Sequence, residues 1–315
     1  MKKTGRIIAI IMVAVLLMIV AACGGDTSNQ TTGNGDNGGN TSTGDNNTGD
    51  SGGQANSNDS ENANDTGNQD ASGDQSQPGN TASGLPTVEE GMLIMGTNAE
   101  FPPYEFWEGG RIVGIDAEIA EAIANKLNLT LRIDDMEFGS IIAAVSAGRI
   151  DMGMAGMTVT EERMESVNFS TSYATGVQVI IVRDGSPITS VDDLFDIGGF
   201  DIGVQESTTG DLYTTWDLEE EGLATIHRYA RGVDAVMALL AGRVDCVVID
   251  NQPAIAFVAV NDGLLILETE FAVEDYAIAL AKGNIELRDA VDAALRELIA
   301  DGTVQAIIDR YITSD

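Results

Sequence analysis

Short apolar runs alternate with helical patterns along the middle of the chain. The apolar runs at 92–95, 129–133, 150–154 and 177–182 have the length of buried strands. Between them, Ile115, Ile119, Ile123 and Leu127 recur every fourth position and predict a helix through Asn128, with Asp116 as its N-cap. A second helix is predicted over 141–147, ending at Gly148. This alternation predicts an α/β fold with a mostly parallel sheet covered by helices on both faces.

The same alternation recurs after Ser190. Strands are predicted over 201–204 and 244–249, and helices over 232–241, 253–260, 286–300 and 304–312. The segment AGRID at 147–151 is echoed by AGRVD at 241–245, and in each copy a glycine ends a helix before an apolar strand. Gly156 and Asp250 come after the two copies at the same distance. Because ligands of open α/β sheets bind at the carboxyl ends of strands, the pattern predicts a cleft between two similar lobes.

The amino terminus has the composition of an export signal. Lys2, Lys3 and Arg6 precede an apolar run at 7–20, which is too short for a comfortable membrane span. The run ends in VAAC, which resembles the bacterial lipobox and implies lipidation of Cys23 after cleavage. A plain signal peptide with an incidental cysteine is the alternative. The lipobox interpretation predicts a membrane anchor on the extracytoplasmic face of the cell.

The segment at 24–85 separates this signal from the apolar patterns. It consists mostly of Asn, Gly, Asp, Ser, Thr and Gln residues, and no large apolar side chain occurs before Leu85. Such a segment has nothing to bury that would offset the entropy of ordering, so we expect a disordered tether.

Composition then narrows the function classes. Fifty acidic residues against sixteen basic ones give a formal net charge of −34, which argues against nucleic-acid binding. Two cysteines do not make a disulfide scaffold, and a single histidine, His227, disfavours a Ser-His-Asp triad or a histidine-rich zinc site. The charge also fits a high-salt habitat, where repulsion between carboxylates is screened.

Four motifs occur in order within the region after the tether. Residues 97–106 read TNAEFPPYEF, 114–119 read GIDAEI, 156–163 read GMTVTEER and 204–210 read VQESTTG. Together they resemble the motifs of bacterial extracellular solute-binding proteins of the polar amino-acid class (family 3), over about residues 92–311. The resemblance implies a type II periplasmic-binding-protein fold, with two α/β lobes joined by a two-stranded hinge and the ligand in the interlobe cleft. Lobe 1 is then 86–174 plus 276–315 and lobe 2 is 175–275, with hinge stretches at 173–177 and 273–277.

The resemblance also implies a function. Such proteins are monomeric receptors that pass amino acids to the permease and ATPase subunits of an ABC importer, without a cofactor, a metal or a catalytic residue. Two alternatives remain. One is an enzyme on the same fold, such as a dehydratase of cyclic carboxylic acids, for which Glu206 is the candidate acid. The other is an amino-acid sensor module.

A buried zwitterion needs a cation and N–H donors for its carboxylate and an anion for its ammonium. By motif position, Arg163, Thr158, Thr208 and Thr209 are the candidates for the carboxylate. Asp250, Gly156 and Thr158 are the candidates for the ammonium. The alternative interpretations are a surface charge for Arg163, a helix cap for Asp250, strand-end hydroxyls for Thr158 and Thr160, and a turn glycine for Gly156.

Candidates for contact with the ligand side chain are Asn98, Phe101, Phe138, Gln205, Glu100 and Tyr104. In the family the matching aromatic residues sandwich the ligand, although Phe101 and Phe138 also fit plain core positions. The amides of Asn98 and Gln205 favour a neutral, glutamine-like side chain slightly over a basic one. Glu100 and Glu206 would favour a cation if they turn inward. Cystine remains open, and the lack of a spare Lys or Arg argues against acidic ligands.

Overall fold

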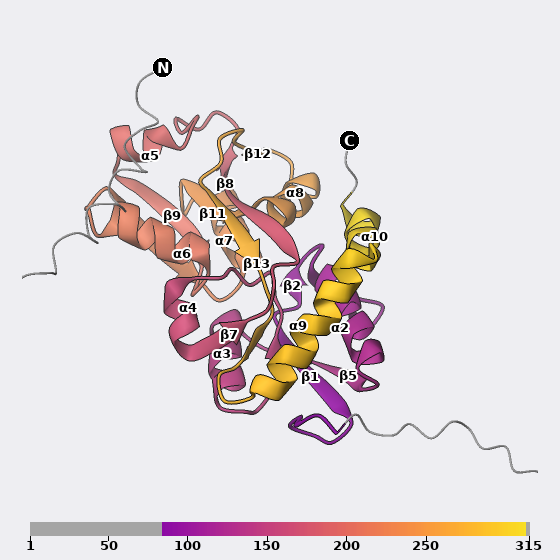
Figure 1. Ribbon diagram of the computed structural model, residues 1–315. Helices are drawn as coiled ribbons and strands as arrows, with labels where there is room; N and C mark the ends of the chain where they lie inside the picture. The colour runs from indigo at the N-terminus through magenta and orange to yellow at the C-terminus, as the bar shows by residue number, and fades with distance from the viewer. Residues whose placement is uncertain (1–83, 313–315) are drawn as a thin grey trace, which may run out of the picture. The chain divides into compact units, whose positions relative to one another are not determined.

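The computed structural model describes residues 84–312, which form two α/β lobes (Figure 1). The predicted signal, Cys23 and the tether up to residue 83 lie outside the described residues, as do residues 313–315. Within the described part, no helix has both the length and the apolar character needed to cross a bilayer.

The first lobe is built on a five-stranded sheet. Its strand order is β5-β1-β6-β14-β7, and the bounds are β1 Met92–Thr97, β5 Thr130–Asp135, β6 Met152–Gly153, β7 Val167–Phe169 and β14 Ala279–Ala281. The pairs of β1 with β5 and β6 are parallel, whereas β14 pairs antiparallel with β6 and β7. A separate three-stranded sheet has the order β2-β3-β4, with bounds β2 Glu100–Phe101, β3 Glu105–Glu108 and β4 Arg111–Val113.

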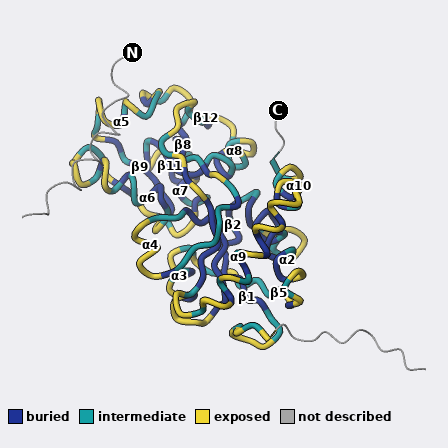
Figure 2. Tube along the Cα trace, viewed as in Figure 1, coloured by how far each residue is buried: buried dark blue, intermediate teal, exposed yellow. Residues whose placement is uncertain are grey.

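Helices cover both faces of the first sheet. On one face a core joins the strands to α2 (Ile115–Lys126), α9 (Ile285–Ala300) and α10 (Thr303–Tyr311). On the other face α3 (Phe138–Ser146) packs through Ile141, Ala144 and Val145. The short helix α4 (Glu161–Ser166) leads into β7. In Figure 2 the strands are mostly buried and the outer faces of the helices are exposed.

The second lobe repeats this arrangement. Its sheet has the order β10-β9-β11-β8-β12, with β13 also paired to β8. The strands are β8 Ala174–Arg183, β9 Phe200–Gln205, β10 Ala224–Tyr229, β11 Cys246–Asp250, β12 Leu264–Ile266 and β13 Ala272–Tyr276. The helices are α5 Asp192–Asp196, α6 Thr209–Thr214, a π-helical turn Thr215–Glu219, α7 Gly232–Leu240 and α8 Asn251–Ala259. Two apolar clusters, one on each face of the sheet, form the core of this lobe.

The chain passes between the sheets twice. It leaves the first sheet after β7 and enters the second at β8, then leaves the second after β13 and returns at β14. β8 and β13 pair antiparallel, with Ala174 opposite Tyr276 and Val177 opposite Val273. The predicted hinge stretches lie on this pair, and the predicted two-lobe α/β fold is confirmed.

Two sequence expectations were wrong in detail, and one small sheet was missed. The sheets are mixed rather than mostly parallel, because the strands on and next to the crossings run antiparallel to their neighbours. Asp116 does not cap α2: the N-cap is Gly114, and Asp116 is buried inside the first turn. The sheet formed by β2, β3 and β4 was not predicted, because its strands are only two to four residues long.

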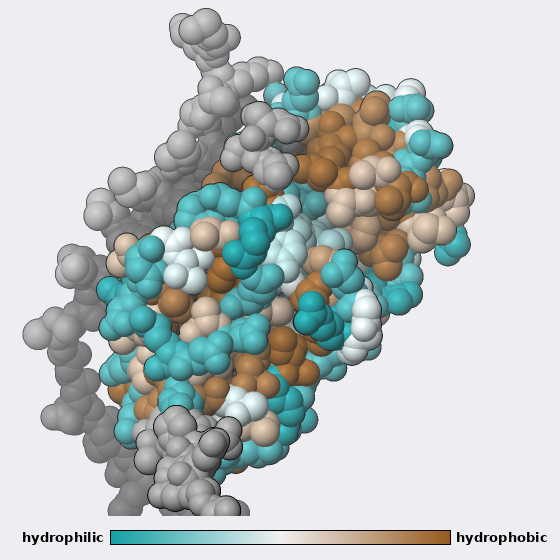
Figure 3. All heavy atoms as spheres, turned by 90° about the vertical axis from the view of Figure 1, so that its right-hand side faces the viewer, coloured by the Kyte–Doolittle hydropathy of each residue, from teal (hydrophilic) through white to brown (hydrophobic). Residues whose placement is uncertain are grey.

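Exposed apolar side chains gather on one part of the second lobe. Ile255 and Val260, in and just after α8, are 52% and 79% exposed, and Leu265 of β12 is 50% exposed. In Figure 3 apolar residues concentrate in the upper part of the molecule, at the height where Figure 1 labels α8 and β12. None of these three residues lines the pocket between the lobes.

Candidate functional site

One pocket between the lobes collects most of the predicted site residues. From the first lobe it is lined by Asn98, Phe101, Glu105, Phe138, Ala155, Gly156, Thr158 and Arg163, and from the second by Gln205, Thr208, Thr209 and Asp250. Ten of these twelve residues were predicted from the motifs. Glu100 and Tyr104 were also predicted but do not line the pocket, whereas Glu105 and Ala155 line it and were missed.

Arg163 lies at the carboxylate end of the predicted site. It sits on α4, where the Thr160 hydroxyl caps the helix by accepting a hydrogen bond from the Arg163 backbone N–H. Its buried guanidinium donates to the carbonyl oxygens of Thr158 (2.7 Å) and Ser207 (3.1 Å) and lies 5.2 Å from the Phe138 ring centroid. Burial lowers the pKa of Arg163, although neighbouring carboxylates oppose this shift. Arg163 is therefore a buried cation that spans the lobes, not a surface charge.

Thr208 and Thr209 lie where α6 begins. Thr208 is the N-cap: its hydroxyl accepts from the Asp211 N–H (3.4 Å) and donates to the Gln205 carbonyl (2.7 Å). The backbone N–H groups of a first helical turn lack partners inside the helix and suit an anionic group. This arrangement places donors of the second lobe in the same pocket as Arg163 of the first.

Asp250 ends β11 and is buried. It occupies the N-cap position of α8, but its side chain makes no capping hydrogen bond, so the helix-cap interpretation fails. Its Oδ1 instead accepts a hydrogen bond from the hydroxyl of Tyr276. Burial and the nearby carboxylate of Glu274 raise the pKa of Asp250 to about 7. An ammonium group beside Asp250 would remove this penalty on its charged form.

Two hinge residues were missed by the sequence analysis. Glu274 of β13 accepts hydrogen bonds from the Thr158 hydroxyl (2.8 Å) and from the Gln178 side chain (3.2 Å). Gln178 of β8 also donates to the Thr209 hydroxyl (3.4 Å). The sequence signal was weak: Gln178 is a polar residue within an apolar run, whereas Glu274 stands next to a second acid, Asp275. They connect predicted site residues of both lobes to the strands about which the lobes would move.

The amides of Asn98 and Gln205 meet across the lobes. The Gln205 side chain donates to Asn98 Oδ1 (3.0 Å), while Asn98 donates to the Met136 carbonyl (3.1 Å). Outside this pair, Glu100 forms an ion pair with Arg231 of the second lobe, 3.3 Å between Oε1 and Nη1. Glu206 is exposed and lines a different groove, so its position does not support the dehydratase alternative.

Tyr104 supports the pocket from behind. It is buried and packs against Phe101 and Tyr276, with ring centroids 5.9 and 5.2 Å apart. Phe101 and Phe138 themselves line the pocket. The two phenylalanines are thus placed to contact a ligand, while Tyr104 holds Phe101 in position.

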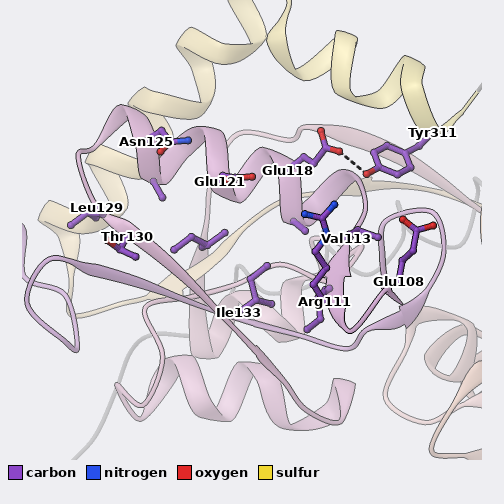
Figure 4. Close-up of a pocket in the computed structure, with 14 residues that line it drawn as sticks. Glu108, Arg111, Val113, Glu118, Glu121, Asn125, Leu129, Thr130, Ile133 and Tyr311 are labelled. Atoms are coloured by element: carbon purple, nitrogen blue, oxygen red, sulfur yellow. Dashed lines mark hydrogen bonds between the residues drawn. The ribbon is translucent and has the colours of Figure 1, made fainter.

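The pocket is almost closed. It leaves about 10 Å³ for the centre of a water molecule, which is room for a single water. A larger groove of about 560 Å³ lies within the first lobe, between β4, α2, β5 and Tyr311 of α10 (Figure 4). The charged residues of that groove are three glutamates, Glu108, Glu118 and Glu121, and one arginine, Arg111, and aliphatic side chains form half of its lining. It lacks the paired donors and carboxylates from two lobes, so the smaller pocket is the better candidate for the site.

The pocket combines the groups that a zwitterion requires. Its lining offers a guanidinium and helix-start N–H groups for a carboxylate, a buried carboxyl group and the Gly156 backbone for an ammonium, and two phenylalanines. In the described part of the chain, no group of three or more His, Cys, Asp and Glu side chains is placed to hold a metal ion. The arrangement therefore fits binding of a small zwitterion by contacts from both lobes.

Known proteins share this architecture. The chain is 33% identical over 226 residues to the arginine-binding extracellular protein ArtP of Bacillus subtilis, covering 71% of this chain and 87% of that protein. An ancestral arginine-binding protein solved with arginine superposes with a TM-score of 0.66 at 38% identity, covering 70% of this chain and 98% of that one. An ancestral arginine-binding protein solved with glutamine gives 0.66 at 37%, covering 72% and 100%. Residues 93–314 match the family model of the bacterial extracellular solute-binding proteins, family 3, and the chain belongs to that family.

Proposed function

We propose that this protein captures a free polar L-amino acid outside the cytoplasm and delivers it to the permease and ATPase of an ABC importer, without catalysing a reaction. The observation that carries the proposal is that one interlobe pocket is lined by both Arg163 and Asp250, opposite charges suited to the carboxylate and the ammonium of an amino acid. A lipid on Cys23 would hold the protein at the membrane as a monomer, with residues 24–85 as the tether.

Each pocket residue has a proposed role. Arg163 pairs with the ligand carboxylate in the bidentate way that a guanidinium permits, assisted by Thr158, Thr208 and Thr209. Asp250 accepts from the ammonium, together with the Gly156 carbonyl and the Thr158 hydroxyl. Phe101 and Phe138 sandwich the side chain, whose polar tip meets Asn98 and Gln205.

We propose arginine as the ligand to test first. The buried carboxyl groups of Asp250 and Glu274 both act on Arg163, so the acids outnumber the base and a ligand with an extra positive charge compensates the site better than a neutral one. The 33% identity with an arginine-binding relative supports the same choice. This reverses the slight preference for a neutral ligand that the amides suggested.

Glutamine is the second candidate. The amide pair of Asn98 and Gln205 lies at the side-chain end of the pocket and can exchange its mutual hydrogen bond for bonds to a ligand amide. The glutamine-bound ancestral structure, at 37% identity, supports this alternative.

Ligand capture requires the lobes to separate and close again. Three interlobe contacts, Arg163 with Ser207, Gln205 with Asn98 and Arg231 with Glu100, shut the pocket. A ligand that touches both lobes stabilises the closed arrangement by its differential affinity for it. The proposed lobes are 86–174 with 276–315, and 175–275, rotating about the β8–β13 pair.

The test is isothermal titration of the full chain in detergent with the twenty amino acids, ornithine and cystine. We expect arginine to bind most tightly. Arg163→Lys should weaken binding at least about 30-fold, because lysine cannot form the bidentate contact. Arg149→Lys, at an exposed position of the first lobe, is the matched control and should leave the affinity unchanged. An absence of binding across the whole panel by the folded, ligand-free protein would overturn the proposal.

A further inference from the structure

Glu105 is a buried acid in the pocket wall that the proposed roles do not use. It is the first residue of β3, has 0% exposure and lines the pocket together with Gly156 and Asp250. Among the described residues, no N–H or O–H group donates a hydrogen bond to either of its carboxyl oxygens. A buried carboxyl group without donors carries a large desolvation penalty when ionised.

Asp116 of α2 explains how Glu105 is accommodated. Its Oδ2 accepts hydrogen bonds from the Gly156 N–H (2.9 Å) and the Tyr173 hydroxyl (2.9 Å), while no donor among the described residues reaches its Oδ1. The Asp116 carboxyl group acts on Glu105 and raises its pKa, so the two buried carboxyl groups lie close together. Two facing carboxyl groups can bond only if one of them holds a proton. Because Asp116 has the donors that stabilise an anion, the proton belongs to Glu105.

The surroundings of this pair are acidic or phenolic. Burial is the largest cause of the raised pKa of Glu105. The carboxyl groups of Asp116, Asp250 and Asp135 raise this pKa further. Burial is the main cause that raises the pKa of Asp116 to about 6. The charges of Asp116 and Glu105 also raise the pKa values of the phenols of Tyr104 and Tyr173. Tyr276 lies on the other side, against Asp250. Glu105 therefore lines the pocket together with Asp250, the proposed acceptor of the ammonium, and no cation among these neighbours neutralises it.

We propose that Glu105 is a further ligand-binding residue, which holds a proton shared with Asp116 in the empty site and releases it to solvent when the ligand ammonium arrives. This inference rests on the proposed function. The step is balanced: the Glu105 O–H bond breaks, the proton leaves to water, and the resulting carboxylate accepts an N–H···O hydrogen bond from the ammonium. The arriving positive charge favours the ionised acid, as any cation close to a carboxyl group does.

The proposal predicts proton release on binding. Arginine is titrated into the full chain in detergent by calorimetry at pH 6.5, in two buffers of different ionisation enthalpy, so that the dependence of the heat on buffer counts released protons. Asp250 can also release a proton on binding, so the test of Glu105 is the difference in released protons between the variant and the wild type. Glu105→Gln should release about one proton fewer than the wild type, and its affinity should rise less steeply between pH 5 and pH 8. At pH 8 the variant should bind about 10- to 100-fold more weakly, because it lacks the charged acceptor.

Glutamine at this position keeps the fold testable. Its NH₂ group can donate to Asp116 Oδ1 as the shared proton did, so thermal unfolding of the free variant should stay close to the wild type. Glu108→Gln, on the exposed side of the same strand, is the matched control and should change neither proton count nor affinity. Equal proton counts for Glu105→Gln and wild type would overturn the inference while leaving the proposed function intact. Loss of arginine binding by the wild type itself would instead count against the proposed function.

Discussion

The segment at 147–151 in the first lobe and the segment at 241–245 in the second form the same local structure. In both, a glycine with positive φ (65° at Gly148, 70° at Gly242) ends the preceding helix. The next residue, an arginine, donates its N–H to a carbonyl five residues earlier, at 3.0 Å in the first lobe and 2.9 Å in the second. Both aspartates then accept a backbone N–H from the neighbouring strand, Asp151 from Ile94 (2.8 Å) and Asp245 from Asp201 (2.9 Å).

The two units differ in the strands to which they lead. In the first lobe the strand β6 covers two residues and leads to Gly156, whose N–H donates to Asp116 and whose φ is +51°. In the second lobe β11 covers five residues and ends at the buried carboxylate of Asp250. One scaffold thus presents backbone groups in one lobe and an anion in the other. The proposed ligand-binding groups therefore differ at the two strand ends, while the helix–glycine–strand unit that precedes them is the same in both lobes.

The largest expected effect comes from replacing the charged end. Asp250→Asn should lower the affinity for the amino acid by at least about 100-fold, because the ammonium loses its ionised acceptor. The same change should stabilise the free protein at pH 8, by on the order of 2 kcal/mol, because a buried carboxylate no longer has to ionise. Calorimetry for affinity and urea denaturation for stability measure the two effects separately.

The pH dependence of stability gives the sign of this effect. The folded pKa of Asp250, about 7, lies above its ordinary value, so the folded protein binds more protons than the unfolded chain between about pH 4 and 7. The contribution of Asp250 to the free energy of unfolding is therefore fully present below about pH 4 and is lost as the pH rises through 7. Asp250→Asn should remove that slope, whereas Asp245→Asn, on the equivalent unit but outside the pocket, should leave affinity unchanged and give no gain in stability. Equal stability of Asp250→Asn and wild type at pH 8 would contradict the argument.

Replacement of Gly156, after the strand of the first lobe, should lower stability as well as affinity, whereas Asp250→Asn lowers affinity and raises stability. A Cβ added at Gly156 would lie 2.8 Å from the Phe101 ring, and the positive φ disfavours any L side chain. Gly156→Ala should therefore cost about 2–3 kcal/mol of unfolding free energy and weaken ligand binding by displacing Phe101. Gly148→Ala has the same backbone strain with no atom within 4 Å of the new Cβ, so it isolates the Phe101 contact. If the two variants have the same free energy of unfolding and the same ligand affinity, a Cβ at position 156 does not displace Phe101.

The sequence predicted the strand ends well because they obey local rules. The glycine stops, the apolar strands and the four motifs are short-range signals, and eleven of the twelve pocket residues, all but Phe138, lie within a motif or directly after a predicted strand. Glu105 was missed although it lies inside the first motif. Its burial close to Asp116 depends on how β3 and α2 pack against each other, which the motif does not reveal.

Contacts across the hinge were beyond sequence reasoning for the same reason. Glu274 and Gln178 read as ordinary polar residues of strands, and only the antiparallel pairing of β8 with β13 brings them together under Thr158 and Thr209. Asp116 was misassigned as a helix cap, because an acidic residue at the start of a helix usually faces solvent. Here the first turn is buried, and the side chain points to the Gly156 N–H instead.

The smallest effect tests whether the two units are equivalent for folding. Gly148→Ala and Gly242→Ala should each cost about 1 kcal/mol, since both glycines have positive φ and neither new Cβ meets an atom within 4 Å. Gly283→Ala, at a glycine without positive φ and with equally open surroundings, is the control and should change stability by less than about 0.5 kcal/mol. Urea denaturation of the three variants gives the comparison. Because neither helix stop lies in the pocket, ligand affinity should stay unchanged in both. A cost in one lobe without the other would show that the repeated segment does not do the same work twice, and the scaffold argument would then hold for one lobe alone.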